Sequence, residues 1–330
     1  MYKISAGMTT NMRKSATDWI AGQACELGLD GIWIGEDIGI GQDVFVLTAA
    51  TLMQSTGVRV GNGIIPITVH NISTTARAAF SLYDLAGERY VFGTGIGGLQ
   101  DLKKRGIHVK KPVTELEREI RTLRSLWNQE QVSIDSQLFH LENYALGIKN
   151  PVTIPVFMGV RGPQMLELAG RIADGVIFSG PIEYLQSAFE IVEDSASKHG
   201  RDPEDIERVV WLPTIIQEEH GTSQLARRVV ALVASDMPSY VLEMLDVNEE
   251  KLSQVVDTVA KKGPSAGAEY VHEELIEAFA ISGTPEQIVK QFDMLGDMGA
   301  TDIILGPPYS KGWRDRMKTV LNIFAERRED

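Results

Sequence analysis

The sequence of 330 residues contains a single cysteine, Cys25, so no intramolecular disulfide can form. Its six histidines are dispersed, and neither they nor Cys25 form the closely spaced ligand pairs that are typical of zinc sites. The chain also lacks the G-x-S-x-G nucleophile elbow and the Walker phosphate loop. These absences argue against a disulfide framework, a resident metal, a serine hydrolase and a P-loop nucleotidase.

Long hydrophobic runs and basic clusters are missing as well. No apolar stretch approaches the roughly 18 residues of a membrane helix, and charges occur too early at the N-terminus for a signal peptide. The net charge is −13, and no cluster of Lys and Arg interrupts it. We therefore expect a cytoplasmic protein that binds neither nucleic acid nor membrane. Any anionic ligand must be held locally, by backbone amides or a few basic side chains.

What the chain does contain is a repeated alternation of short β-branched runs and amphipathic helical stretches, which indicates βα units around parallel strands. The predicted strands cover residues 2–6, 31–36, 59–65, 90–96, 155–160, 174–180, 207–216 and 301–307. Eight such units fit a (β/α)8 TIM barrel better than a doubly wound sheet with a separate domain. We expect one domain over residues 1–330, with insertions at about 128–154 and 236–283, the second helical at 269–281.

Two helices are specified in detail. The first is predicted to bury one face and to turn the opposite face to water. The buried face comprises Leu116, Ile120, Leu123 and Trp127, and the water-facing residues are Glu115, Glu119, Arg121 and Arg124. The second begins Thr284-Pro285-Glu286-Gln287, with the spacing of a capping box and proline at the first helical position.

Two adjacent acids, Glu36 and Asp37, follow the apolar run 31-GIWIG-35 and precede a glycine-rich turn. Barrel active sites lie at the C-terminal ends of the strands, so both acids belong to the mouth. They are either a solvated loop pair or a site where one carboxylate faces an enclosed cleft and transfers protons. Because side chains alternate along a strand, we expect only one to enter the cleft. Glu36 has the longer reach.

Glycine motifs follow three other strands. The segment 93-GTGIGG-98, which contains Gly95, is open to three interpretations: a dinucleotide fingerprint, a strand end beneath a flat cofactor ring, or a structural bend. The sequence Gly63-Ile64-Ile65-Pro66 indicates a bulge or a strained bond. The lone His70 just beyond it is typical of a hydrogen-bonding or capping residue rather than a general acid.

The turn Gly159-Val160-Arg161-Gly162 joins a strand to a helix that begins near Pro163. Free N–H groups at a helix start, together with the Arg161 side chain, form a phosphate site. Ser179, at the end of the next strand, adds a donor for the same anion. The alternative is an ordinary βα turn.

Taken together, these motifs resemble the bacterial-luciferase-like barrel superfamily, and within it the coenzyme F420-dependent methylenetetrahydromethanopterin reductases of archaea. The similarity runs through nearly the whole chain. It is carried by WIGED (33–37), VGNGI (60–64), GERYVFGTGIGG (87–98), RGIHVKKPVTELEREIRTLRSLW (105–127), PVFMGVRGPQMLELAGRIADGVIFS (155–179), LIEAFAISGTPEQ (275–287) and LGDMGATDIILGPP (295–308).

The resemblance implies a luciferase-like barrel that holds F420 at its mouth and passes hydride between the deazaflavin and a small organic substrate, pterin-like in the reductases. Gly63–Ile64 matches the family's non-proline cis peptide behind the ring. Gly159 to Gly162 and Ser179 match its phosphate-binding region, and Glu36 matches its acid near the ring. A homo-oligomer, dimer or tetramer, is expected.

The departures from this subfamily concern its polar side chains. Ala6 and Gly98 stand where the reductases carry a glutamate and an aspartate, Arg161 replaces a glutamine, and Asp37 replaces a histidine. Reduction of a methylene-bridged pterin needs a proton donor for the released nitrogen, so the acids at 36 and 37 are candidates for that role. Two alternatives stay open: an FMN-dependent luciferase-type monooxygenase and a noncatalytic paralogue of an active barrel.

Overall fold

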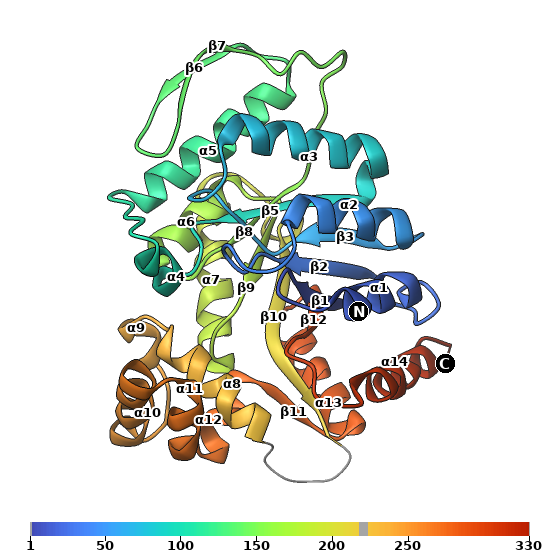
Figure 1. The fold of residues 1–330 in the computed structure, drawn as a ribbon, viewed down its shortest axis with the longest axis vertical. Helices are drawn as coiled ribbons and strands as arrows, with labels where there is room; N and C mark the ends of the chain where they lie inside the picture. Colours follow the sequence, from blue (N-terminus) through green and yellow to red (C-terminus); the bar gives the residue numbers. More distant parts are fainter. Residues whose placement is uncertain (1, 218–223, 330) are drawn as a thin grey trace.

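The computed structural model describes residues 2–217 and 224–329, and its centre is a closed barrel of eight parallel strands (Figure 1). In barrel order these are β1 (Lys3–Thr9), β2 (Gly31–Gly35), β3 (Arg59–Asn62), β5 (Tyr90–Gly95), β8 (Val156–Gly159), β9 (Gly175–Phe178), β10 (Glu207–Ile216) and β12 (Asp302–Gly306). Parallel pairing of β12 with β1 closes the barrel. The predicted fold is therefore confirmed, and every predicted strand overlaps one of these.

Helices surround the barrel on the outside (Figure 1). They are α1 (Lys14–Gln23), α2 (Val44–Gln54), α3 (Ile72–Ala86), α5 (Pro112–Trp127), α6 (Pro163–Ile172), α7 (Ile182–Lys198), α13 (Pro285–Asp297) and α14 (Trp313–Glu329). The predicted capping box at the start of α13 is confirmed: the Thr284 backbone N–H donates to the Gln287 side chain at 2.9 Å.

Two segments depart from the βα repeat, at the places where insertions are predicted. The first forms an antiparallel hairpin of β6 (Val132–Asp135) and β7 (His140–Tyr144), at the top of Figure 1. The second holds α9 (Ser239–Leu242), α10 (Glu249–Lys262), α11 (Pro264–Gly267), α12 (Glu273–Phe279) and β11 (Ile281–Gly283), after α8 (Gln224–Ser235). Strand β11 pairs with the far end of β10. That the chain forms one domain stays a prediction.

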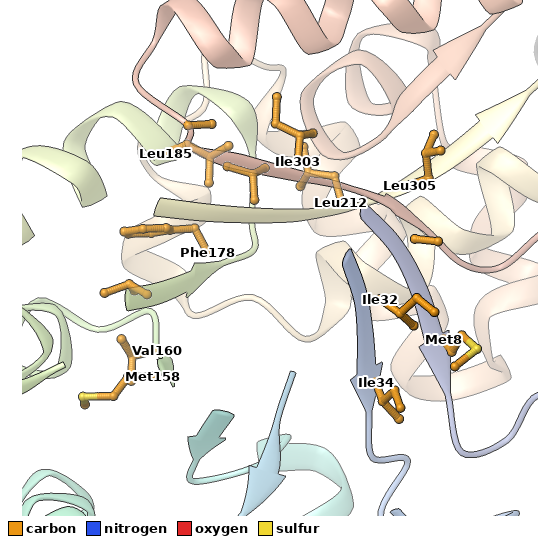
Figure 2. Close-up of a cluster of buried hydrophobic side chains, with 14 of the residues drawn as sticks. Met8, Ile32, Ile34, Met158, Val160, Phe178, Leu185, Leu212, Ile303 and Leu305 are labelled. Atoms are coloured by element: carbon orange, nitrogen blue, oxygen red, sulfur yellow. The ribbon is translucent and has the colours of Figure 1, made fainter. Parts of the chain in front are cut away.

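Strand alternation divides the apolar side chains into two cores. Figure 2 shows part of the larger core, between strands and helices, with Ile32 and Ile34 of β2 near Met8 of β1. The smaller core fills the barrel interior and consists of Trp33, Val91, Phe157, Ile177, Val209 and Ile304. Trp33 thus points to the opposite side of β2 from its two neighbours.

The lower end of the barrel, where the strands begin, is closed by an ionic cluster around Arg59. Its guanidinium contacts Glu207 at 2.7 Å and Asp302 at 2.9 Å, and lies 5.4 Å from the centre of the Trp33 ring. Asp302 is fully buried and also accepts hydrogen bonds from Ser5 Oγ (2.7 Å) and Trp33 Nε1 (3.0 Å). Every charge here has a partner, as a buried ion pair requires.

One prediction about α5 is wrong. Leu116, Ile120, Leu123 and Trp127 are buried as predicted, but Glu115 and Glu119 are buried too, each 3% exposed. The reason is that α5 meets neighbours on several sides, since it contacts α3, α6 and β6. Both acids have polar partners instead of water: Glu115 pairs with Arg118, and Glu119 lies against Thr94 of β5.

Candidate functional site

A cavity of about 610 Å³ opens at the upper end of the barrel, where the strands end. All predicted site residues except Gly95 line it, namely Glu36, Asp37, Gly63, Ile64, Gly159, Val160, Arg161, Gly162 and Ser179. They come from the ends of four strands, β2, β3, β8 and β9, and from the loops that follow. This is the end of a barrel that carries active sites.

One wall of the cavity is the chain between β3 and β4 (Ile65–Pro66). The Gly63–Ile64 peptide bond is cis, as the resemblance implied, and β4 then pairs with β5. The Ile64 side chain occupies space that glycines leave open. A Cβ at Gly159 would lie 2.5 Å from Ile64 Cγ2, and one at Gly95 would lie 2.9 Å from Ile64 Cδ1.

Gly95 therefore packs against Ile64 and Gly159 and lies outside the cavity lining. Of the three interpretations of residues 93–98, the dinucleotide fingerprint is wrong because the strands form a closed barrel. Only the short helix α4 (Leu99–Lys104) follows the motif, with Gly98 as its N-cap. Gly97 and Gly98 do line the cavity, so the far end of the motif belongs to the site.

The floor of the cavity contains an aromatic side chain that the sequence analysis missed, Trp211 of β10. Its indole lies close to glycines from several strand ends: a Cβ at Gly63 would lie 2.6 Å from Trp211 Cζ3, and one at Gly7 would lie 3.0 Å from Cζ2. Any larger residue at either position would displace the indole. Strand alternation gives a signal for it, because Trp211 lies on the same side of β10 as the interior residue Val209.

The acid Glu36 is fixed by two contacts. His70 Nε2 lies 2.7 and 2.9 Å from the two carboxylate oxygens, and the Glu36 backbone N–H donates to the Ile64 carbonyl at 3.3 Å. The Glu36 side chain is only 11% exposed, which excludes the solvated-loop interpretation for this residue. His70 is a hydrogen-bonding residue, as predicted.

The expectation that only one of the two acids enters the cleft is wrong, because both Glu36 and Asp37 line the cavity. Strand β2 ends at Gly35, so the alternation of a strand no longer applies to them. Asp37 has its own partners: its carboxylate accepts the Asn11 backbone N–H at 3.1 Å, and its backbone N–H donates to Thr10 Oγ1 at 2.9 Å.

The opposite end of the cavity offers donors for an anion. Gly162 is the N-cap of α6, and Pro163 is its first residue. The Arg161 guanidinium donates to Ser179 Oγ at 3.0 Å and lies 3.7 Å from Asp236 Oδ2. The Tyr184 hydroxyl donates to the Arg161 carbonyl. The nearby Tyr240 hydroxyl is buried and lies beside the Tyr184 hydroxyl.

Two further acids line the cavity without having been predicted, Asp101 of α4 and Asp236 of the second insertion. A Cβ at Gly98 would lie 3.7 Å from the Asp101 carboxylate, so an acid occupies the space beside that glycine. Burial raises the pKa of Asp236, although Arg161 opposes the shift. Neither residue belongs to a motif, and only the folded chain brings them to the strand ends.

Ala6, which stands where the reductases carry a glutamate, lies outside the cavity. Its side chain is fully buried in the larger core, between strand and helices, and does not line the cavity. The inward-facing positions of β1 are its neighbours: Gly7 faces Trp211, and Thr9 lines the cavity. An acid at position 6 would therefore point away from the site in this chain.

Within residues 2–217 and 224–329, no three His, Cys, Asp or Glu side chains are grouped so that they could hold a metal ion. None of the helices in these ranges is both long and apolar enough to cross a membrane.

Comparison with known proteins gives consistent results. A family model described as luciferase-like monooxygenase matches residues 3–302. The 5,10-methylenetetrahydromethanopterin reductase of Methanolobus tindarius is 27% identical over 298 residues, which cover 89% of this chain and 90% of the relative. The reductase of the same name from Archaeoglobus fulgidus is 26% identical over 331 residues, with 98% of each chain covered.

Solved structures with the same fold include two F420-dependent enzymes. The tetrahydromethanopterin reductase of Methanopyrus kandleri superposes with a TM-score of 0.87 at 20% identity, with 97% of each chain covered. An F420-dependent secondary alcohol dehydrogenase in complex with an F420-acetone adduct superposes with a TM-score of 0.79 at 17% identity, with 98% of each chain covered. At these identities the likeness establishes the fold alone.

Proposed function

The chain belongs to the luciferase-like monooxygenase family, and on that premise we propose that it is an oxidoreductase dependent on the deazaflavin coenzyme F420. Its substrate is a small organic molecule that exchanges hydride with the coenzyme. Two full-length relatives at 26–27% identity are named for methylenetetrahydromethanopterin reduction, so a CH–NH donor of the pterin type is our first candidate. The observation that carries the proposal is the cavity, with an apolar wall at one side and anion donors at the other.

The residues fit such a coenzyme. Ile64, Ile177 and Trp211 form an apolar surface for a flat ring, and glycines make the room in which the Ile64 and Trp211 side chains lie. Arg161 and the N-terminus of α6 can hold an anionic tail. When bound, the coenzyme supplies a ring carbon that donates or accepts hydride.

The protein's own contribution is to position and to move protons. His70 orients the Glu36 carboxylate at the ring side of the cavity. Reduction of a C–N bond leaves a nitrogen that needs a proton, and Glu36 is the enclosed acid that can supply it. Asp101 beside Gly98 is a second candidate donor, but its side chain is 51% exposed and pairs with Lys104.

A competing proposal is an FMN-dependent monooxygenase. The family model is described as luciferase-like monooxygenase, and a long-chain alkane monooxygenase shares the fold with a TM-score of 0.71 at 13% identity, covering 99% of this chain and 91% of that one. The same ring surface would accept a flavin. A noncatalytic paralogue is the third possibility, and it would bind neither coenzyme productively.

A titration of the purified protein with F420 and with FMN separates these alternatives. We expect F420 to bind more tightly than FMN. The absorbance band of the deazaflavin should therefore shift at a lower ligand concentration than the absorbance band of FMN. Arg161→Ala should weaken F420 binding and reduce the dependence of the affinity on salt concentration. The reason is that the net negative charge of the protein repels an anionic ligand, so the ligand must be held by a local cation. Tighter binding of FMN, or no binding of either, would contradict the proposal.

The expected homo-oligomer also remains a proposal, and exposed apolar side chains of α2 and its surroundings support it. Val46 is 68% exposed and Met53 67%, with Ile40 and Leu85 nearby in sequence or on the adjoining helix α3. A second copy of the chain would cover them. Light scattering should give a mass above one chain for the parent, and Val46→Lys should lower it.

A further inference from the structure

A buried acid lies behind the barrel wall, outside the cavity. Glu119 of α5 is 3% exposed, and its Oε2 lies 3.1 Å from Thr94 Oγ1 of β5. No lysine, arginine or histidine contacts its carboxylate among the described residues. Burial raises the pKa of Glu119 to about 8. The side chain therefore carries its proton at neutral pH.

The geometry around Thr94 shows which group accepts the hydrogen bond from that proton. Thr94 Oγ1 also lies 3.0 Å from the Ile65 carbonyl oxygen. A carbonyl can only accept, and a hydroxyl has one hydrogen to give. If Thr94 donates to Ile65, the remaining bond must be donated by the protonated Glu119. The three groups then form one chain, from Glu119 to Thr94 to Ile65, with every hydrogen assigned.

This chain ends next to the cavity wall. Ile65 directly follows Ile64, whose side chain lines the cavity and whose carbonyl accepts the Glu36 backbone N–H. We propose that Glu119 is a positioning residue, which holds the Ile64 wall in place through Thr94 so that the wall fits a flat ring. The part of the proposal that concerns the ring rests on the proposed function.

Substitutions at both ends of the chain test it. Glu119→Leu and Thr94→Val remove the hydrogen bonds but keep the volume approximately. Each should weaken F420 binding by about tenfold, which corresponds to about 1.4 kcal/mol, the size of one net hydrogen bond. Glu119→Gln and Thr94→Ser keep a donor in place and should restore the affinity to within about twofold of the parent.

A matched control lies one turn away on the same helix. Glu115 has the same exposure as Glu119, but it pairs with Arg118 and does not contact the wall. Glu115→Leu should therefore leave F420 affinity unchanged, even if it lowers stability. Thermal unfolding of each variant shows whether the protein is folded under the conditions of the titration.

Hydrogen exchange of the free protein gives a second measurement, which needs no coenzyme. The amides of residues 63–65 and 67 should exchange faster in Glu119→Leu and Thr94→Val than in the parent or in Glu115→Leu. Unchanged exchange and affinity in both folded variants, or equal losses in Glu119→Gln and Glu119→Leu, would overturn the proposal. If the parent binds no F420, the proposed function fails, but the exchange experiment still decides whether Glu119 fixes the wall.

Discussion

The two ends of the barrel interior differ in how their charged side chains are balanced. At the lower end Arg59, Glu207, Asp302 and Trp33 satisfy one another, and Asp302 is fully buried. At the upper end four carboxylates and a single arginine line an open cavity, so the charges of the lining do not balance. The comparison teaches that charged groups stabilise the fold where their charges balance, and are available to a ligand where their charges do not balance.

The pKa shifts follow the same division. At the lower end burial would raise the pKa of Glu207, but hydrogen bonds and charges from Arg59 and Lys3 outweigh it and lower the pKa. At the upper end burial raises the pKa of Asp236, and the charge of Arg161, which lies 3.7 Å away and is shared with Ser179, does not outweigh it. The Glu207 carboxyl is therefore held charged, whereas the Asp236 carboxyl is held closer to neutral.

The largest effect is expected at the lower end. Asp302→Asn leaves Arg59 buried with half of its compensating charge, so we expect the free energy of unfolding to fall by about 3–5 kcal/mol. Chemical denaturation measures this change. Asp101→Asn, at an exposed acid of the upper end, should cost less than about 1 kcal/mol and serves as the control. A loss of F420 affinity in folded Asp302→Asn would break the division between the two ends.

Next in size is a pH effect from Glu119. Its pKa is about 8 in the folded chain against an ordinary 4.5, so the folded state binds the proton more tightly than the unfolded state. The stability it contributes is complete below the unfolded pKa and is lost as pH rises through the folded pKa. Between about pH 5 and pH 8 the free energy of unfolding of the parent should fall by about 3–4 kcal/mol relative to that of Glu119→Gln.

Thermal unfolding of both proteins across that range measures the difference. The Glu207 carboxylate, with its lowered pKa, has the opposite sign: its contribution is present above its unfolded pKa and is lost only in acid. Glu115→Gln is the control for a buried acid on the same helix. If the stabilities of the parent and Glu119→Gln stay parallel from pH 5 to pH 8, Glu119 does not carry a proton in the folded chain.

At the upper end, Glu36→Gln should lower turnover at least tenfold, since general acid assistance is typically worth about 10²–10⁴ in rate. F420 affinity should stay within a few-fold, because the backbone bond from residue 36 to Ile64 is kept. Asp37→Asn should have the smaller effect. Single-turnover hydride transfer measures both, and equal, negligible effects would remove the carboxylates from the mechanism.

The smallest expected effect has the opposite direction. Asp236→Asn removes one negative charge and frees Arg161 for an anionic ligand. We expect F420 to bind about two- to fivefold more tightly, the range of a partly exposed ion pair. Titrations at several salt concentrations measure it. Weaker binding would mean that Asp236 itself contacts the ligand.

The sequence predicts the barrel well because its signals are local. Each strand is a short β-branched run, and the start of α13 is specified by four consecutive residues. The site residues at strand ends follow from the same local reading, since a parallel barrel brings the ends of its strands together. Glu36 and the turn at 159–162 could therefore be placed without coordinates.

What the sequence does not predict depends on contacts between distant segments. Glu119 reads as a water-facing residue of α5 until Thr94, 25 residues earlier, is seen beside it. Trp211 reads as one more apolar strand residue, although glycines of several other strands make room for its indole. Asp236 lines the cavity although it follows helix α8 and not a barrel strand.

The hydrogen bond from the Glu36 backbone N–H to the Ile64 carbonyl has a consequence for how such a protein can acquire new substrates. This hydrogen bond couples the position of Glu36 to that of the Ile64 wall, so a mutation that shifts either also shifts the other. Residues of the segment 236–240 also line the cavity, but they belong to the insertion after α8 and do not take part in that hydrogen bond. We expect new substrates to be acquired through changes in this segment, while the acid and the wall are inherited together.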